Sequence, residues 1–356
     1  MILKLISLHN FRNFKDKHFK INSHLTAIFG KNACGKTNLL EGIYFLVRGE
    51  GFRETREEEL IIFDKFEAHV EGVLEDKKNK DNNSFRISLI KNDFGLDKFY
   101  FLGKTKKGRQ SYLKDILPVV LFSPEQIKII NGTPSMRREY FDKFLSGIDS
   151  EYKKRLMNYS QALRKRNKIL EKTFNIVDLK QELKFWNDYL INQGNYLIDK
   201  RREYTEYLNR NKKIDSKEFF IKYESNDINK DRFNEYFDRE IKIRKTLIGP
   251  QKDDFKIYLI NSSSPDGKNV HLYGSRSEQR LALFWLKINE LKYLESFFKK
   301  KPILLLDDIF SELDHDNQKL IFNLIGNYQT VITSTEKELI KLINLSYHPS
   351  YDTIDL

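Results

Sequence analysis

Apolar positions along the chain change their spacing twice, which divides the sequence into three parts. In the first part, short apolar runs at 3–8 and 25–29 predict strands, and the second run is apolar enough for a buried strand. Residues 36–47 place Leu39, Leu40, Ile43, Tyr44 and Val47 on one face, which predicts an amphipathic helix. Further strands are predicted at 67–74, 85–90 and 98–102, with loops at 76–84 and 92–97 and a basic loop at 103–109.

The middle of the chain is predicted to be helical. A junction with Pro124, Gly132 and Pro134 precedes residues 136–245, which contain two glycines and no proline. Leu, Tyr, Lys and Glu recur there at helical spacing, and the long candidate helices are 151–173 and 178–209. Gly249 and Pro250 end this block.

Strands and helices alternate again in the last part. The predicted elements are a strand at 255–260, a loop at 261–268, a helix at 277–299, a buried strand at 303–306, a helix at 317–325, a strand at 329–333 and a helix at 336–345. Because strands with helices occupy both ends, we expect one α/β domain built from residues 1–120 and 250–356. A mostly helical domain of residues 121–249 would be inserted in it.

One segment between a predicted strand and a predicted helix matches the phosphate-loop pattern G-x-x-x-x-G-K-[ST] in full. Its glycines permit a tight turn whose N–H groups face phosphate oxygens, and the following helix start adds the positive end of its dipole. Its lysine suits the β- and γ-phosphates, and its final hydroxyl suits Mg²⁺. The alternative is a glycine turn before an ordinary helix. The cysteine is interpreted as a small loop residue and not as a nucleophile, because no His or Asn partner is seen that would activate it. The segment consists of Gly30, Lys31, Asn32, Ala33, Cys34, Gly35, Lys36 and Thr37.

Two carboxylates follow the buried strand at 303–306. Asp307 is suited to hold Mg²⁺ beside a phosphate loop, and Asp308 is suited to polarise an attacking water. Together with Lys36 they are the predicted catalytic residues; acids that cap a strand at a turn are the alternative. Residues 311–317 offer ordinary helix caps, and the hydroxyl cluster at 333–335 suits either a terminal phosphate or turn chemistry.

The chain is basic, with 63 Lys and Arg against 51 Asp and Glu, a formal net charge of +12. Residues 121–250 hold 28 basic and 20 acidic residues, so two-thirds of the excess lies there. Nucleic acid would explain this charge, and so would a compositional bias toward Lys, Asn and Ile. The single cysteine, Cys34, allows no intrachain disulfide and fits a reducing compartment. No run approaches about 18 apolar residues and residues 1–9 do not resemble a signal peptide, so neither a membrane span nor secretion is expected.

Three further segments, together with the phosphate loop, have a recognisable pattern. They are HNFRNF at 9–14, YGSRSEQR at 273–280 and LLLDDIFSELD at 304–314, and stretches at 121–138 and 246–254 support them. The chain thereby resembles the RecF family, bacterial DNA repair and replication ATPases of the ATP-binding-cassette and chromosome-maintenance group. The phosphate loop is shared by many NTPases, whereas the first and third of these segments are much more specific. The resemblance covers nearly the whole chain.

The resemblance implies a cassette-type ATPase head with an inserted helical domain, ATP and Mg²⁺ as ligands, and a cytoplasmic setting. Two heads would sandwich ATP in an ATP-dependent homodimer, with the phosphate loop of one subunit facing the signature segment 275–279 of the other. The chain departs from the family pattern at Ser277, where Gly is usual, and at Glu278, where Gln is usual. Thr37 and Asp307 would bind the metal. Beyond the phosphate loop, the implied nucleotide contacts are Asn38, Arg12, Asn13, Ser275 and Thr335.

A DNA-binding face is predicted in the helical insertion. Residues 151–168 hold seven basic side chains and one acidic one, and two basic triplets lie 11 residues apart, so they share a helix face with Tyr152 and Tyr159 interleaved. Such a face suits phosphates without reading bases, although a solvated helix face is the alternative. The candidates are Lys153, Lys154, Arg155, Arg164, Lys165 and Arg166, and in the loop at 103–109 they are Lys104, Lys106, Lys107 and Arg109.

The predicted function is that of an ATP-dependent DNA-binding protein of recombinational repair and replication recovery, a weak, DNA-stimulated ATPase. Its implied partners are single-stranded and double-stranded DNA, gapped or at junctions, and the mediator proteins RecR and RecO. The alternatives are a transporter's cassette ATPase and a chromosome-organising protein. The helical insertion and the segment at 10–14 argue against the first, and the absence of sustained heptads in 151–245 argues against the second.

Overall fold

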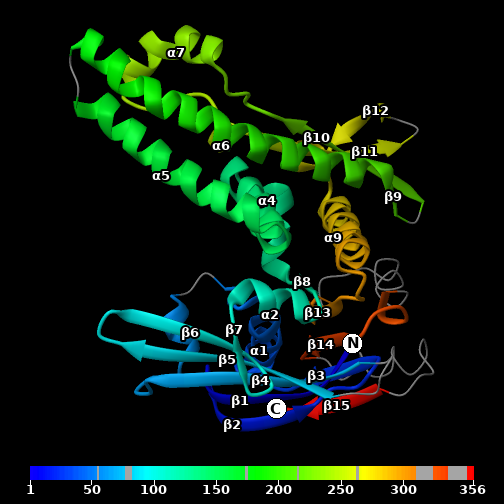
Figure 1. Cartoon of the computed structure of the whole chain (residues 1–356). Coiled ribbons are helices and arrows are strands. Elements are labelled where there is room, and N and C mark those ends of the chain that lie inside the picture. Colours follow the sequence, from blue (N-terminus) through cyan, green and yellow to red (C-terminus); the bar gives the residue numbers. More distant parts are fainter. Residues whose placement is uncertain are drawn as a thin grey trace. The chain divides into compact units, whose positions relative to one another are not determined.

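The computed structural model describes residues 1–53, 56–76, 82–172, 175–214, 216–261, 264–309, 324–335 and 351–356 (Figure 1). The chain divides into two compact units: unit 1 is Met1–Gln126 with Lys287–Leu356, and unit 2 is Ile127–Leu286. The helix predicted at 336–345 and most of the helix predicted at 317–325 lie outside the described residues. So do residues 310–314 of the third resemblance segment.

Unit 1 contains two sheets with helix α1 (Lys36–Arg48) packed between them. One sheet is antiparallel, in the order β2-β1-β4-β5-β6-β7, and the other is parallel, in the order β15-β3-β14-β13-β8. The antiparallel strands are β1 (Ile2–Phe11), β2 (Phe14–Lys20), β4 (Glu67–Glu75), β5 (Asn82–Asn92), β6 (Gly95–Leu102) and β7 (Thr105–Lys107). The parallel strands are β3 (Leu25–Phe29), β8 (Val119–Phe122), β13 (Ile303–Asp307), β14 (Thr330–Ser334) and β15 (Tyr351–Asp355), and α2 (Arg109–Asp115) precedes β8.

Hydrophobic burial explains the position of α1. Its apolar side chains belong to the same core as those of both sheets, and all five residues of β3 are buried, as expected for an inner parallel strand. Gly42 on α1 permits a close approach to β1, because a Cβ there would lie 2.6 Å from a methyl carbon of Leu8. The phosphate loop at the start of α1 is therefore fixed to the core of unit 1.

Unit 2 combines helices with a small antiparallel sheet in the order β12-β11-β10-β9. The prediction of a block of several helices at 136–245 is wrong at 213–214 and 217–224, where β9 and β10 form. Phe219 and Ile221 of β10 alternate into the core. No described helix has the length and apolar composition to cross a membrane. The elements are α3 (Lys128–Asn131), α4 (Pro134–Ile148), α5 (Ser150–Lys172), α6 (Ile176–Arg210), β9 (Lys213–Ile214), β10 (Lys217–Glu224), α7 (Lys230–Ile243), β11 (Asp254–Asn261), β12 (Ser264–Asn269) and α8 (Val270–Tyr273).

The second boundary between the units differs from the predicted one at residue 250. Strand β11 pairs with β10 from Glu224↔Asp254 to Glu218↔Ile260, which places it in unit 2. Arg137 of α4 adds a two-pronged ion pair to Asp254, at 2.7 and 2.8 Å. The boundary falls instead between Leu286 and Lys287, inside helix α9 (Arg276–Phe298).

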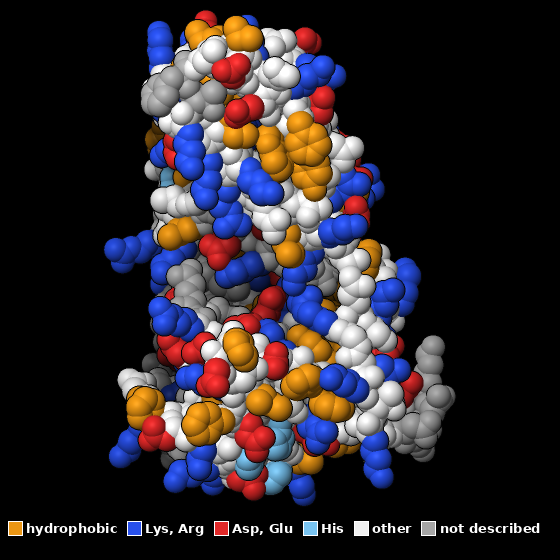
Figure 2. Space-filling view, turned by 60° about the vertical axis from the view of Figure 1, so that its left-hand side comes forward, with side chains coloured by type: hydrophobic (Ala, Val, Ile, Leu, Met, Phe, Trp, Pro, Cys, Tyr) orange, Lys and Arg blue, Asp and Glu red, His pale blue; other side chains and the backbone are white. Residues whose placement is uncertain are grey.

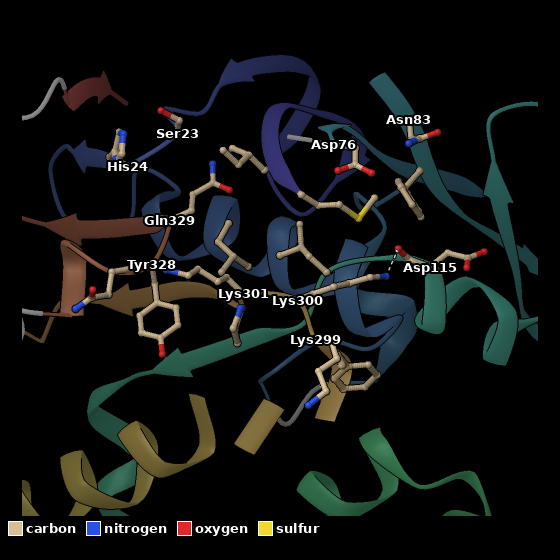
Figure 3. Close-up of a pocket in the computed structure, with 18 of the residues that line it drawn as sticks. Ser23, His24, Asp76, Asn83, Asp115, Lys299, Lys300, Lys301, Tyr328 and Gln329 are labelled. Atoms are coloured by element: carbon tan, nitrogen blue, oxygen red, sulfur yellow. Dashed lines mark hydrogen bonds between the residues drawn. The ribbon is translucent and has the colours of Figure 1, made fainter. Parts of the chain in front are cut away.

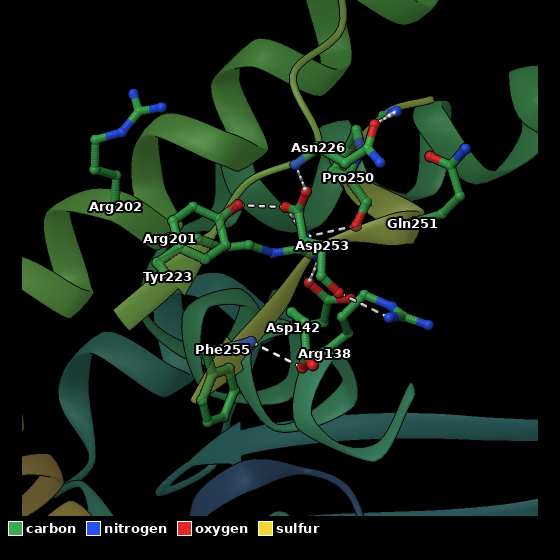
Figure 4. A network of polar contacts seen from close by, with 12 residues as sticks. Arg138, Asp142, Arg201, Arg202, Tyr223, Asn226, Pro250, Gln251, Asp253 and Phe255 are labelled. Atoms are coloured by element: carbon green, nitrogen blue, oxygen red, sulfur yellow. Dashed lines mark hydrogen bonds and ion pairs between the residues drawn. The ribbon is translucent and has the colours of Figure 1, made fainter. Parts of the chain in front are cut away.

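A buried polar network connects several elements of unit 2 (Figure 4). Arg201 of α6 donates to Asp142 of α4 at 2.7 Å and to Asp253 at 2.8 Å. Asp253 also accepts a hydrogen bond from the Tyr223 hydroxyl. The backbone N–H of Asn226 donates to Asp253 at 2.7 Å. Because every charge in this network has a partner, it fixes one arrangement of helices and strands within unit 2.

Candidate functional site

The phosphate loop lies between the end of β3 and the first residue of α1. Gly35 has a φ of 115° and Ala33 a φ of 65°, so the loop turns through left-handed conformations before the helix begins. A Cβ on Gly35 would lie 2.6 Å from the side-chain nitrogen of Asn13. The sequence therefore needs glycine here both for the turn and for the close approach of Asn13.

The Lys36 side chain bends back over this loop. Its Nζ donates hydrogen bonds to the carbonyl oxygens of Gly30 at 2.8 Å and Lys31 at 3.0 Å, and the residue is only 8% exposed. A cation held by backbone carbonyls at the N-terminus of a helix makes a site for an anion, because phosphate oxygens can replace the carbonyls as partners.

The two predicted metal ligands lie next to each other. Thr37 Oγ1 donates to Asp307 Oδ1 at 3.0 Å, although 270 residues separate them. Strand β14 lies between β3 and β13, so the carboxyl ends of these parallel strands bring the loop and Asp307 to the same edge of the sheet. Burial raises the pKa of Asp307, while hydrogen bonds from Thr333 and Thr37 oppose that rise.

Thr333 is a site residue that the sequence indicated only as part of a hydroxyl cluster. Its Oγ1 donates to Asp307 Oδ1 at 2.9 Å and accepts from the backbone N–H of Asp308 at 2.9 Å. Asp308 has a φ of 47°, which turns the backbone directly after β13. Thr335 is exposed, just past the end of β14. The signal that identifies Thr333 is its place near the end of a strand beside β13.

The predicted contacts at Arg12, Asn13 and Asn38 lie around the start of α1. Asn13 donates to the carbonyl oxygen of Cys34 at 3.2 Å and accepts from Asn38 at 2.8 Å. Arg12 forms an ion pair with the buried Glu41 at 2.7 Å. Arg53, which donates to Asn38 at 2.9 Å, was not predicted, nor was Glu41. Neither matches a motif, so only the fold places them beside the loop.

Ser275 belongs to unit 2, where it caps helix α9. Its Oγ accepts from the backbone N–H of Glu278 at 3.2 Å, and the Glu278 carboxylate accepts from the backbone N–H of Ser275 at 2.7 Å, which is a capping box. Lys268 donates to both carboxylate oxygens at 2.8 Å. Burial alone would raise the pKa of Glu278, but these hydrogen bonds lower it below its usual value. The departures at 277–278 thus include a glutamate with a defined structural role.

The predicted basic face of α5 is only partly exposed. The prediction that Arg166 contacts DNA from the surface of α5 is wrong, because the residue is fully buried and forms an ion pair with the buried Glu240 at 2.6 Å. Tyr152 and Tyr159 are also buried, so they do not interleave with surface cations. Eleven residues correspond to three turns, but successive side chains within a triplet lie about 100° apart, and in the second triplet this turns Arg166 toward the core.

The remaining cations of α5 have different surroundings. Arg155 pairs with Glu151 at 2.7 Å and lies over the ring of Tyr196. Lys165 lies over Trp186 with its Nζ 5.1 Å from the ring centroid. The exposed basic positions along the helix form what we call the α5 stripe. It consists of Lys154, Arg164, Lys165, Lys168 and Lys172.

The second DNA candidate, at 103–109, is not wholly a loop, because β7 and the start of α2 form there. Lys106 Nζ lies 4.0 Å from the ring centroid of Phe99, and Arg109 donates to the carbonyl oxygen of Arg48 at 3.4 Å. Lys104 is exposed and Lys107 is half-buried. On the face in Figure 2, Lys and Arg side chains are interspersed with acidic and hydrophobic ones. Local partners therefore matter more than the total charge.

The residues present suit Mg²⁺ only together with phosphate. Among the described residues, no three His, Cys, Asp or Glu side chains cluster as metal ligands. Mg²⁺ is usually held by one or two protein ligands, water and substrate phosphates, and Thr37 with Asp307 provides such a partial set.

A separate cavity of about 800 Å³ lies in unit 1, and His24, Pro302 and Gln329 line it at the N-terminal ends of the parallel strands (Figure 3). Lys300 Nζ donates there to the carbonyl oxygen of Asp115 at 2.7 Å. Burial lowers the pKa of Lys300. The nucleotide-site residues lie at or just beyond the C-terminal ends of these strands, so this cavity is not part of that site.

Comparison with known proteins places this geometry in a family. The family model described as the RecF/RecN/SMC N terminal domain matches residues 2–348. The DNA replication and repair protein RecF of Agathobacter rectalis is 32% identical over 345 residues, which cover 94% of this chain and 92% of that protein. RecF of Natranaerobius thermophilus is 34% identical over 373 residues, which cover 95% and 92%.

Solved structures agree. The recombination mediator protein RecF with ATP, in the RecFOR pathway, has a TM-score of 0.80 and 30% identity over 94% of this chain and 92% of that chain. An Smc head domain from Pyrococcus furiosus, with a TM-score of 0.51 and 18% identity over 96% and 91%, shares the fold. The phosphate loop, the Asp307 site and these likenesses over most of the chain lead to one conclusion: the chain belongs to the RecF family, within the RecF/RecN/SMC group of ATPases.

Proposed function

We propose that this protein is an ATP-dependent DNA-binding ATPase of recombinational repair and replication recovery. The observation that carries the proposal is the contact of Thr37 with Asp307 beside the folded-back Lys36, which is the arrangement that a phosphoryl-transfer site needs. The names of the relatives support the repair role, and the solved RecF structure with ATP supports the nucleotide. No observation favours a transporter or a chromosome-organising role over it.

Each site residue has a chemical role in this proposal. The loop N–H groups and Lys36 bind the phosphates of ATP, and Thr37 with Asp307 holds Mg²⁺, which would neutralise phosphate charge. Asp308, which follows Asp307 at the same edge of the sheet, orients the attacking water. Thr333 keeps both aspartates in place through its two hydrogen bonds.

The ATP-dependent homodimer is part of the proposal. Ser275 is exposed at the N-terminus of α9, a 23-residue helix whose dipole favours an anion there. In the capping box its Oγ acts as an acceptor, so its hydroxyl proton can be donated to a phosphate oxygen held by a second subunit. Hydrolysis would weaken that bridge and release the dimer.

DNA contact is proposed through the α5 stripe and, secondarily, through Lys104 and Lys107. The stripe lies within residues 121–250, the part of the sequence with the largest excess of basic residues. Phosphate contacts of this kind bind without reading bases and weaken steeply with salt. RecR and RecO are the proposed protein partners, in keeping with the RecFOR pathway named for the structural relative.

The test is DNA affinity with and without ATP and Mg²⁺, across several salt concentrations and for single-stranded, duplex and gapped DNA. We expect ATP to strengthen DNA binding and DNA to accelerate ATP hydrolysis. Asp308→Asn is expected to bind ATP normally and to hydrolyse it about 100-fold more slowly. If the DNA affinity of the wild-type protein is the same with and without ATP, the proposal is contradicted. If Asp308→Asn hydrolyses ATP at the wild-type rate, the role of Asp308 is contradicted.

Ser275→Arg tests the dimer separately. We expect the variant to bind ATP as a monomer and to form no dimers with ATP in light scattering. A matched exposed serine elsewhere, Ser135, provides the control, since Ser135→Arg should leave ATP-induced dimers intact. Dimers of Ser275→Arg in the presence of ATP would contradict the sandwich arrangement.

A further inference from the structure

Glu41 is a fully buried carboxylate close to the phosphate loop, and the nucleotide site described so far gives it no role. It lies on α1, one helical turn after Thr37, and its side chain has no exposed surface. A buried charge is costly unless cations or hydrogen-bond donors surround it. Glu41 is therefore tolerated at this position only together with the groups that compensate it.

Two arginines from different segments provide that compensation. Arg12, which follows β1, donates from Nε to Glu41 Oε2 at 2.7 Å. Arg53 approaches the same oxygen from the segment after α1, with its Nε at 3.9 Å, and its backbone N–H donates to the other carboxylate oxygen at 3.4 Å. One carboxylate thus contacts both the backbone and the side chain of Arg53.

A chain of contacts continues from Arg53 to the phosphate loop. Arg53 donates to Asn38 at 2.9 Å, Asn38 donates to Asn13 at 2.8 Å, and Asn13 donates to the carbonyl oxygen of Cys34 at 3.2 Å. Each amide is used on both its oxygen and its nitrogen, so a displaced Arg53 leaves the Asn38 oxygen without this donor. The buried carboxylate is linked in this way to the backbone that would hold phosphate.

Arg53 adds positive charge beside the phosphate loop, because it donates to Asn38, the residue that follows Thr37. Two arginines and one glutamate leave one net positive charge next to the loop. Glu41 contacts Arg53 through both carboxylate oxygens, and Asn38 accepts a hydrogen bond from the Arg53 guanidinium.

We propose that Glu41 is a positioning residue of the nucleotide site: it holds Arg53 beside the phosphate loop, so that ATP turnover proceeds with this cation already in place. The inference rests on the proposed ATPase function. A cation that is fixed before the reaction stabilises the charge on the transferred phosphoryl group without reorganisation, whereas a mobile one does not. Glu41 acts through Arg53 and does not touch the substrate.

The test compares steady-state ATP hydrolysis by the full chain with DNA present. Glu41→Gln should lower kcat about 10-fold or more, since a small displacement near a reacting group has effects of this size. KM for ATP should stay constant or fall, because the variant removes a negative charge near the phosphates. In the Arg53→Ala background, adding Glu41→Gln should change kcat less than about twofold. Wild-type kcat in Glu41→Gln, or an undiminished effect of Glu41→Gln on Arg53→Ala, overturns the proposal.

Two further variants separate positioning from damage to the fold. Glu290→Gln alters another buried glutamate of unit 1, ion-paired with Lys287 at 2.7 Å, and should keep both kcat and KM. If Glu41→Gln does not fold, Glu41→Asp keeps the charge but shortens its reach, and it should lower kcat with KM unchanged. Wild-type kcat in a folded Glu41→Asp, or a rise in KM equal to the decrease in kcat, overturns the proposal.

Failure of the proposed function has a different signature. A wild-type chain that neither binds nor hydrolyses ATP overturns both conclusions. A wild-type chain that hydrolyses ATP, with a Glu41→Gln variant that matches it, overturns only the positioning role.

Discussion

The nucleotide site of unit 1 and helix α5 of unit 2 both depend on basic side chains, but they hold them differently. Lys36 is nearly buried and is bound by two backbone carbonyls of its own loop. On α5, Arg164 is exposed, while Arg166, two residues later, is buried against Glu240. The partners of a cation, more than its residue type, decide whether it binds a ligand, supports the fold or contacts solvent.

The sharpest test of the unit 1 half of this comparison is Lys36→Met. We expect ATP affinity to fall by more than about 100-fold, because the substitution removes the ammonium group that would bind the phosphates and leaves only the backbone N–H groups of the loop. Isothermal titration calorimetry measures this directly. The exposed Lys17 of β2 provides the control, since Lys17→Met should bind ATP as the wild type does. If Lys36→Met binds ATP as tightly as the wild type, then Lys36 is not a ligand-binding cation, and the difference from the cations of α5 disappears.

Arg166→Met and Arg164→Met test the other half. Removal of the Arg166 charge leaves Glu240 as an unpaired buried carboxylate, so the free energy of unfolding should fall by about 3–5 kcal/mol. Removal of the Arg164 charge should change it by less than about 0.5 kcal/mol. Chemical denaturation of both variants gives the two values. If the two variants have the same free energy of unfolding, the burial of Arg166 does not make its charge more important for stability than that of Arg164.

Charge reversal on the α5 stripe has a smaller expected effect. Replacing Arg164, Lys165 and Lys168 by Glu should weaken DNA binding and lower the slope of log affinity against log salt by about one unit for each DNA phosphate that is no longer neutralised. Fluorescence anisotropy at several salt concentrations measures this slope. An unchanged slope would mean that α5 carries its charge without contacting DNA.

The smallest expected effect concerns the capping box of α9. Because the folded pKa of Glu278 is lowered, its contribution to stability is present above the pKa of the unfolded chain and disappears as pH falls through the folded value. We expect a decrease in stability of about 1 kcal/mol or less as the pH falls below about 4. Thermal melts of the wild type and Glu278→Gln from about pH 7 to about pH 3 should converge in acid. If the melting temperatures of the two proteins differ by the same amount at every pH, the ion pair of Lys268 with Glu278 does not contribute to stability.

The sequence was most informative where the backbone itself makes the site. The loop at 30–37, strand β3 and Asp307 at the end of β13 lie where their spacing predicted, because a parallel sheet aligns the ends of its strands. It was least informative on α5, because no local pattern shows that Glu240 of α7 meets Arg166. The short strands β9 and β10 were missed because they interrupt a long run of helix-forming residues, and the boundary at 250 moved because β11 pairs with β10.

The order of strands around β14 has a consequence for how the protein is made. Strands β13 and β14, with Asp307 and Thr333, are synthesised long after the phosphate loop that they join. A ribosome that stalls within unit 2 has therefore produced a phosphate loop without Asp307, its proposed metal ligand. The proposed nucleotide site, with Asp307 and Thr333 in place, can therefore form only after most of the chain has been translated.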